Sequence, residues 1–207
     1  MSNQDRVPRT DRGSNTRRRL LEAAERVFAE RGYHDASIVK ITEAAGVAQG
    51  TFYIYFSGKQ EIFDELVIDL NHRVRQAMAE ASSQGTTRSD AERRGFEAFF
   101  RFTGEHPALY RIIRQAEFVS PHTLRLHYER IVEGYVEGLT RARGAGEVAD
   151  LDPDVVAWAL MGTGELIGMR YVLWDERHTI PDHVFEETMR FVRRGLGSGN
   201  DDQQEDA

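Results

Sequence analysis

The nine residues AQGTFYIYF, Ala48 to Phe56, combine two kinds of chemistry in one short stretch. The first four, Ala48 to Thr51, are small or polar, so that another molecule can come close to the backbone there. The amide of Gln49 can both donate and accept at an adenine edge, and the methyl groups of Ala48 and Thr51 can touch a thymine methyl. This end of the stretch has the chemistry of a surface that contacts base edges of DNA.

The second half of the stretch is aromatic. Phe52 and Phe56 are expected to anchor the segment to its scaffold, whereas the hydroxyls of Tyr53 and Tyr55 can reach phosphate oxygens. Taken singly, each tyrosine also fits an ordinary half-buried aromatic residue, and Lys59 fits a solvated charge. We therefore interpret the ordered set, rather than any single member, as the signal.

Two further elements must position this stretch. An N-cap at Asn15 or Thr16 predicts a helix that ends near Gly32, and a second helix follows Ser37, a good N-cap, and stops at Gly46. A short helix over 48–54 comes next. Helix, glycine-containing turn and short helix form the helix-turn-helix arrangement. The expected buried faces of the first two helices comprise Leu20, Leu21, Ala24, Val27 and Phe28, and Ile38, Ile41 and Ala45.

The remaining chain is also predicted to be helical. Ser57 is expected to open a helix to about residue 80, with Gln60 completing a capping box. Later helices are expected through EAFFRF and after Pro107, Ser120, Asp152 and Pro181, with the one after Asp152 reaching about residue 174. The fold class is therefore all-α with about nine helices, and no strand is expected.

Charge and composition narrow the functional classes. Residues 1–60 hold ten basic and seven acidic residues, whereas residues 61–207 hold seventeen and twenty-seven. A basic head on an acidic body is typical of a nucleic-acid-binding part joined to a part with another role. The leader is equally compatible with a solvated, disordered basic tail.

Other classes are disfavoured. The chain has no cysteine and no pair of histidines at the i, i+4 spacing of a helical metal site. We accordingly expect no catalytic site, metal or cofactor. No apolar run is long enough for a membrane span, and the polar N-terminus does not match a secretory signal, so a cytoplasmic location without membrane contact is expected.

The segment SIVKITEAAGVAQGTFYIYFSGKQEIFDELV, Ser37 to Val67, resembles the DNA-binding segment of the TetR family of bacterial transcription regulators. The preceding helix is similar to the first helix of that family. Two positions depart from the family pattern, because Ala48 stands where serine is frequent and Gln49 where a basic residue is frequent. The loss of a capping serine is expected to cost about 0.5–2 kcal/mol of local helix stability.

The resemblance implies a homodimer that binds a palindromic double-stranded DNA operator and is released by a small-molecule inducer, with an aromatic acid or an acyl-coenzyme A as candidate classes. Two recognition helices would lie about 34–36 Å apart or somewhat farther. Bases would face Ala48, Gln49, Gly50 and Thr51, and phosphates would be held by Ser37, Lys40, Tyr53, Tyr55 and Lys59. The leader Arg6 to Arg19 would follow the minor groove or the backbone.

The domain organisation expected from this resemblance has four parts. Residues 1–13 form a disordered basic leader, 14–74 the helix-turn-helix domain, 75–197 a helical ligand-binding and dimerisation domain, and 198–207 a disordered acidic tail. Candidate ligand-binding residues are Phe99, Phe102, Tyr110, Tyr128, Tyr135, Trp158, Met161 and Glu165. Candidate dimer contacts are Gly164, Gly168, Phe185, Met189 and Val192.

Both sets have plainer interpretations. Aromatic residues and methionine at helical spacing are more often ordinary core, and the glycines would equally suit a kinked helix that packs within its own subunit. Three other functions stay open: an activator or architectural DNA-binding protein without a ligand, a protein–protein module whose helix-turn-helix no longer binds DNA, and, least favoured, an enzyme.

Overall fold

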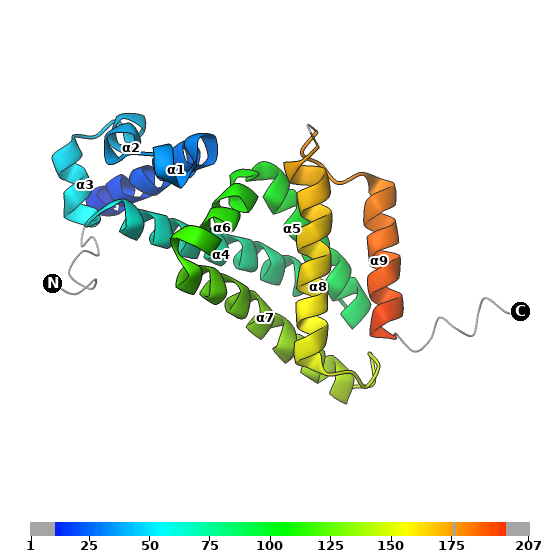
Figure 1. Cartoon of the computed structure of the whole chain (residues 1–207). Helices are drawn as coiled ribbons and strands as arrows, with labels where there is room; N and C mark the ends of the chain where they lie inside the picture. The colour runs from blue at the N-terminus through cyan, green and yellow to red at the C-terminus, as the bar shows by residue number, and fades with distance from the viewer. Residues whose placement is uncertain (1–10, 176, 198–207) are drawn as a thin grey trace, which may run out of the picture. The chain divides into compact units, whose positions relative to one another are not determined.

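The computed structural model of the chain describes residues 11–175 and 177–197. Over these ranges it contains nine α-helices and a π-helical turn, and no strand, so the prediction of an all-α fold with about nine helices is confirmed (Figure 1). None of these helices has the length and hydropathy that a membrane span requires. The elements are α1 (Asp11–Asp35), α2 (Ile38–Ala45), α3 (Gln49–Tyr55), α4 (Lys59–Ser82), α5 (Arg88–Glu105), α6 (Ala108–Val119), α7 (Pro121–Gly144), α8 (Pro153–Gly168), η2 (Met169–Leu173) and α9 (Asp182–Leu196).

The chain divides into two compact units that do not follow the order of the sequence. The first comprises Met1–Leu70 and Ala108–Arg125, and the second comprises Asn71–Pro107 and Leu126–Ala207. The division therefore falls inside α4 and inside α7. The whole of α6 belongs to the first unit, although the sequence alone had grouped it with the C-terminal body.

The first unit is built around α1. This helix packs against α2 and α6, and α2 packs against α3 (Figure 1). The face expected from its periodicity is the face it buries, since the exposed fractions of Leu20, Leu21, Ala24, Val27 and Phe28 do not exceed 7 %. The ring of Phe28 lies edge-on to that of Phe63 on α4, with centroids 5.2 Å apart.

The ends of these helices are set by local residue chemistry. At Gly32 the backbone of α1 leaves helical geometry, with φ 74° and ψ 167°, a conformation that only glycine adopts readily. Ser37 caps α2 as expected, because its Oγ accepts from the backbone N–H of Lys40 at 3.3 Å. Gly46 ends α2 with φ 63° and ψ 41°, and no side chain caps Ala48 at the start of α3.

Two expected helix starts are corrected. The first helix begins at Asp11 rather than after Asn15, so residues 11–13 of the expected leader are helical; residues 1–10 lie outside the described residues. The helix expected from Ser57 begins at Lys59, so the pairing shifts by one residue. Glu61, and not Gln60, accepts from both the backbone N–H and the Oγ of Ser57.

The second unit buries one hydrophobic cluster between α5, α7, α8 and α9. Its members are Phe96, Phe100, Val132, Leu139, Ala157, Leu160, Met189, Val192 and Leu196. Two polar residues set the helix starts, since Thr87 caps α5 and Asp152 caps α8 through hydrogen bonds to first-turn N–H groups. The long helix expected from Asp152 to about residue 174 exists, but its last turn is the π-helix η2. The segment after it is held by His178, whose Nδ1 lies 2.6 Å from the carbonyl oxygen of Val172.

Candidate nucleic-acid interface

The seven residues of α3 separate into a buried face and an exposed one. Phe52, and Phe56 just beyond the helix, are completely buried, with their ring centroids 5.5 Å apart. Gln49, Gly50 and Tyr53 are exposed. The burial of the two phenylalanines confirms them as the anchors that the sequence predicted, and it leaves the polar front of the helix open to solvent.

The front of α3 leaves room for another molecule. A Cβ atom added at Gly50 would meet nothing within 4 Å, so packing inside the chain does not require a glycine there. Ala48 beside it is exposed, whereas Thr51 and Tyr55 are half-buried. The closest access to the α3 backbone is therefore at 48–50, the positions expected to approach bases.

One exposed residue of this helix was missed by the sequence interpretation. The side chain of Ile54 is 63 % exposed, four residues after Gly50 and therefore on the same side of the helix. Helical periodicity alone was enough to find it, because position 54 falls on the side opposite the buried Phe52 and Phe56. Val39 on α2, 46 % exposed, is a second apolar residue at the surface of this motif.

The turn between α2 and α3 is held by hydrogen bonds from both its own backbone and α1. The N–H groups of Gly46 and Val47 donate to carbonyls of the last turn of α2, at 3.1 and 3.0 Å. In addition, Arg19 donates to the carbonyl of Ala45 at 2.6 Å and Arg26 to that of Ala44 at 3.3 Å. The angle at which α3 leaves α2 is thus fixed from two sides.

The basic leader has a different role where it is described. Arg17 pairs with Glu65 at 2.7 Å and lies over the ring of Phe56, and Arg19 is bound to the end of α2. Both side chains therefore stabilise the fold of the first unit. Arg18 is exposed and donates to Oδ1 of Asn15 on the same helix at 2.9 Å. Arg6, Arg9 and the side chain of Arg12 lie outside the described residues.

Lys59 also serves the fold. Its Nζ donates to the carbonyls of Tyr33, Ala36 and His34, at 2.7, 2.9 and 3.2 Å, and lies 4.4 Å from the centroid of the Tyr33 ring. A lysine ammonium group has three donors. All three are directed at the carbonyls of residues 33–36 at the end of α1, so none is left for the phosphate expected of Lys59.

The remaining expected phosphate contacts lie at the start of α2. The Oγ of Ser37 is used as the helix cap, and the Nζ of Lys40 makes one exposed hydrogen bond, at 3.3 Å, to the carbonyl of Asp35. Both residues are half-buried, and a single exposed hydrogen bond leaves Lys40 with donors for a phosphate.

The expected ligand-binding residues are divided between the two units. Tyr110 belongs to the first unit and is buried there, whereas the other members lie in the second. Among these, Tyr128 donates to Glu165 at 2.8 Å, which provides a partner for a carboxylate in an otherwise apolar helix. Phe99, Tyr135 and Met161 pack against the hydrophobic cluster of this unit, Phe102 is buried, and Trp158 is 43 % exposed.

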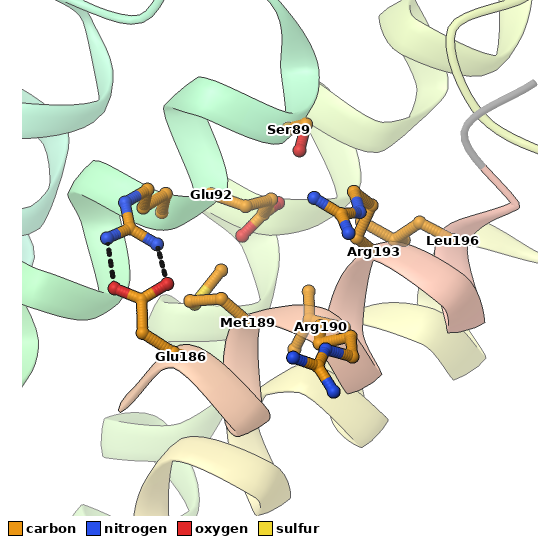
Figure 2. A pocket seen from close by; sticks show the side chains of 9 residues that line it. Ser89, Glu92, Glu186, Met189, Arg190, Arg193 and Leu196 are labelled. Carbon is orange, nitrogen blue, oxygen red and sulfur yellow. Dashed lines mark hydrogen bonds and ion pairs between the residues drawn. The ribbon is translucent and has the colours of Figure 1, made fainter. Parts of the chain in front are cut away.

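Two cavities adjoin α5 and α9 in the second unit. One, of about 190 Å³, is lined by residues that include the buried Glu92 and Met189 and the exposed Arg193 (Figure 2). Burial raises the pKa of the Glu92 carboxyl group in this cavity. Arg93 and Glu186, joined by two hydrogen bonds of 2.9 and 2.5 Å, form one side of the same cavity. The other is an open groove of about 590 Å³ beside Phe100, Ile180 and Phe185. Of the expected dimer contacts, Met189 and Val192 line the first cavity and Phe185 lines the second. None of the expected ligand-binding residues lines either cavity.

Most of the expected dimer contacts point into their own chain. A Cβ atom at Gly164 would lie 3.4 Å from the ring of Phe96, and Gly168, Met189 and Val192 are buried. Phe185 is half-buried and packs on the core cluster. The glycine at 164 therefore allows α8 to pack closely against α5. This is the alternative in which the helix packs within its own subunit.

Comparison with known proteins agrees with this geometry. Residues 20–66 match the family described as bacterial regulatory proteins, tetR family. The chain is 31 % identical to the HTH-type transcriptional regulator YdgC of Bacillus subtilis, over 92 % of this chain and 97 % of YdgC. It is 29 % identical to the HTH-type transcriptional activator FasR of Mycolicibacterium smegmatis, over 93 % and 86 %.

A solved structure shares the fold over most of the chain. The transcriptional regulator FadR from Bacillus subtilis, in complex with stearoyl-CoA, superimposes with a TM-score of 0.77 at 22 % identity, over 86 % of this chain and 98 % of FadR. The match of the helix-turn-helix, the nearly full-length relationship to YdgC and the all-helical fold lead to one conclusion. The chain belongs to the TetR family of bacterial transcriptional regulators.

Proposed function

We propose that this regulator binds a palindromic operator as a homodimer, represses transcription there, and is released by a long-chain acyl-coenzyme A. The observation that carries the DNA-binding part is the division of α3 into buried phenylalanine anchors and an exposed front. DNA binding is assigned to helices within residues 14–74, and effector binding and dimerisation to residues 75–197. The packing of α6 in the first unit adds that helix to the DNA-binding structure.

The contacts with DNA follow from exposure. Gln49, Gly50 and Thr51 face bases together with Ala48, and Ile54 adds an apolar contact suited to a thymine methyl. Phosphates are held by Ser37, Lys40, Tyr53 and Tyr55. Lys59 is not included, because the carbonyls of the segment after α1 use its donors.

We assign the contact with the second subunit to the outer face of α8 and α9, which pack against each other. Val155 and Leu166 on α8 are 65 % and 62 % exposed, and between them lie the exposed Ala159 and the open Gly162. On α9, Phe191 is 66 % exposed. Apolar residues at this spacing form a stripe that a matching pair of helices can cover.

The effector class is supported by a relative and by chemistry. FadR, which shares the fold over most of its length, was solved with stearoyl-CoA bound. In the present chain, Phe99, Tyr135 and Met161 are partly buried apolar residues on α5, α7 and α8 that pack on the hydrophobic cluster, and an acyl chain would insert among them. The flexible thioether of Met161 suits a site that must repack around such a chain.

A second candidate is activation rather than repression. It is favoured by the similarity to FasR, a transcriptional activator, over 93 % of this chain. The two candidates share the DNA-binding site and differ in whether the operator overlaps the promoter or lies upstream of it.

Selection of bound sequences from a random duplex pool tests the proposal. We expect a palindromic consensus, and we expect stearoyl-CoA to release a fragment that carries it, whereas free coenzyme A does not. Failure to select any consensus would exclude DNA binding. A consensus whose binding is indifferent to acyl-coenzyme A thioesters of several chain lengths would exclude the effector class alone.

A further inference from the structure

The interruption of α1 at Gly32 leaves a backbone group that another helix completes. The N–H of Tyr33, the residue after the break, donates to Oε1 of Gln115 on α6 at 2.5 Å. The two residues are 82 positions apart in sequence and belong to the same compact unit. A side chain of α6 therefore supplies the acceptor that the interrupted helix does not.

The Gln115 side chain is itself held in place. Its Nε2 donates to the carbonyl of Arg111, one turn earlier on α6, at 2.9 Å. Arg111 in turn donates to the carbonyl of Ala29 on α1 at 3.3 Å. With both ends of its amide engaged, Gln115 has one orientation in which it can accept from Tyr33.

The segment that Gln115 holds leads directly into the helix-turn-helix. Residues 33–36, which comprise the end of α1 after the break at Gly32 and the residue that follows it, lead to Ser37, the cap of α2. Their carbonyls are bound by Lys59, and the Tyr33 hydroxyl donates to Gln60 at 2.9 Å. Gln60 also donates to the carbonyl of Val119 at the end of α6, at 3.3 Å. The segment is therefore held through its carbonyls by α4 and through its N–H by α6.

We infer that Gln115 is a positioning residue for DNA binding: by fixing the segment before α2, it sets where α2 and α3 stand relative to α1. The inference rests on the proposed binding of an operator. Gln115 itself need not touch DNA, because it acts through the backbone of Tyr33. Its acceptor oxygen, and not its size, is the group that matters.

The test measures operator affinity for three variants of the full-length protein, with the consensus duplex selected by the wild type. Gln115→Ala removes the acceptor, and Gln115→Glu keeps an acceptor oxygen at the same distance from the backbone. Glu117→Ala is the matched control, an exposed residue two positions along the same helix. Hydrogen exchange of residues 33–47 is measured in parallel, at a temperature where every variant is folded.

We expect Gln115→Ala to weaken operator binding by about three- to tenfold, as for one lost hydrogen bond, and to accelerate exchange at 33–37. Glu117→Ala should stay within twofold of the wild type, and Gln115→Glu, which keeps the acceptor for Tyr33 but loses the donor to the Arg111 carbonyl, should fall between the wild type and Gln115→Ala. Equal affinity for wild type and Gln115→Ala would overturn the inference while leaving operator binding intact. Faster global unfolding of Gln115→Ala with unchanged affinity would likewise overturn it, because the residue would then be structural only.

Discussion

At the scale of single residues, the same side-chain chemistry serves different ends depending on what lies within reach. A lysine in the first turn of α4 suits a phosphate contact by sequence, but three carbonyls at the end of α1 lie within 3.2 Å of its Nζ. Hydrogen bonds from a charged donor are individually stronger than neutral ones. Lys59 is therefore a clamp between α4 and the segment that precedes α2.

Replacing Lys59 with methionine should keep the packing of its stem and remove all three hydrogen bonds. We expect the free energy of unfolding to fall by about 2–3 kcal/mol, because three backbone carbonyls, among them that of the buried Ala36, lose a charged donor. Urea denaturation at neutral pH measures the change. Lys40→Met is the control, since Lys40 makes one exposed hydrogen bond, and it should change stability by less than about 0.5 kcal/mol.

His127 gives a prediction about pH. Its ring is buried, Nδ2 of Asn71 lies 3.1 Å from its Nδ1, and Nε of Arg75 donates to the side-chain Oδ1 of Asn71 at 2.9 Å. Burial, with a smaller contribution from the Arg75 charge, lowers the pKa of His127 from 6.5 to about 4. Between these values the unfolded chain binds the proton and the folded chain does not. Stability should therefore decline as pH falls through this window, by about 3 kcal/mol at most.

Urea denaturation at several pH values between 7.5 and 4 measures that decline. In His127→Gln the contribution of this residue should disappear, leaving a shallower dependence on pH. His122→Gln, on the exposed side of the same helix, should keep the slope of the wild type. Parallel slopes for wild type and His127→Gln would assign the acid sensitivity to other groups.

At the scale of elements, capping residues define where the helices of the helix-turn-helix begin and end. Of these helices, α3 has no side-chain cap at its start. Ser37 caps α2 and Gly46 ends it with a left-handed conformation, but Ala48 provides no side-chain acceptor to α3. The helix is only seven residues long. Its stability therefore comes from the buried phenylalanines and not from its own hydrogen bonds.

Introducing a cap tests this view of α3. Ala48→Ser should stabilise the helix by about 1 kcal/mol, because a serine Oγ can accept from a first-turn N–H. We expect slower hydrogen exchange at 50–53 and a higher urea midpoint. Ser37→Ala provides the opposite change at the start of α2, and it should destabilise by a similar amount.

The sequence predicted where the helices begin and end better than it predicted which side of each helix is buried. Caps, glycines and prolines marked both ends of α2 and the starts of α6, α7, α8 and α9 to within one or two residues. By contrast, α8 is apolar on several sides, so periodicity could not distinguish the side of Gly164, which meets α5, from the side of Val155 and Leu166. The clamps made by Lys59 and Gln115 were equally hidden, since they depend on contacts between residues distant in sequence.

At the scale of the whole molecule, the apolar stripe on α8 and α9 makes the oligomeric state testable. Leu166→Glu or Phe191→Glu should convert the proposed dimer to a monomer, because a carboxylate would have to be buried without a partner. Sedimentation equilibrium measures this, and operator affinity should fall with it. Phe118→Glu, at a residue 83 % exposed in the first unit, should leave both unchanged.

The composition of the first unit bears on how such regulators can be recombined. Its helices come from two separate stretches of chain, because α6 packs on α1 across nearly forty intervening residues that belong elsewhere. A chimera with a single junction after Leu70 would contain the donor's α3 but not the donor's Gln115, which holds the segment before α2. To exchange DNA specificity between homologues, residues 108–125 of the donor must therefore be exchanged together with its residues 1–70.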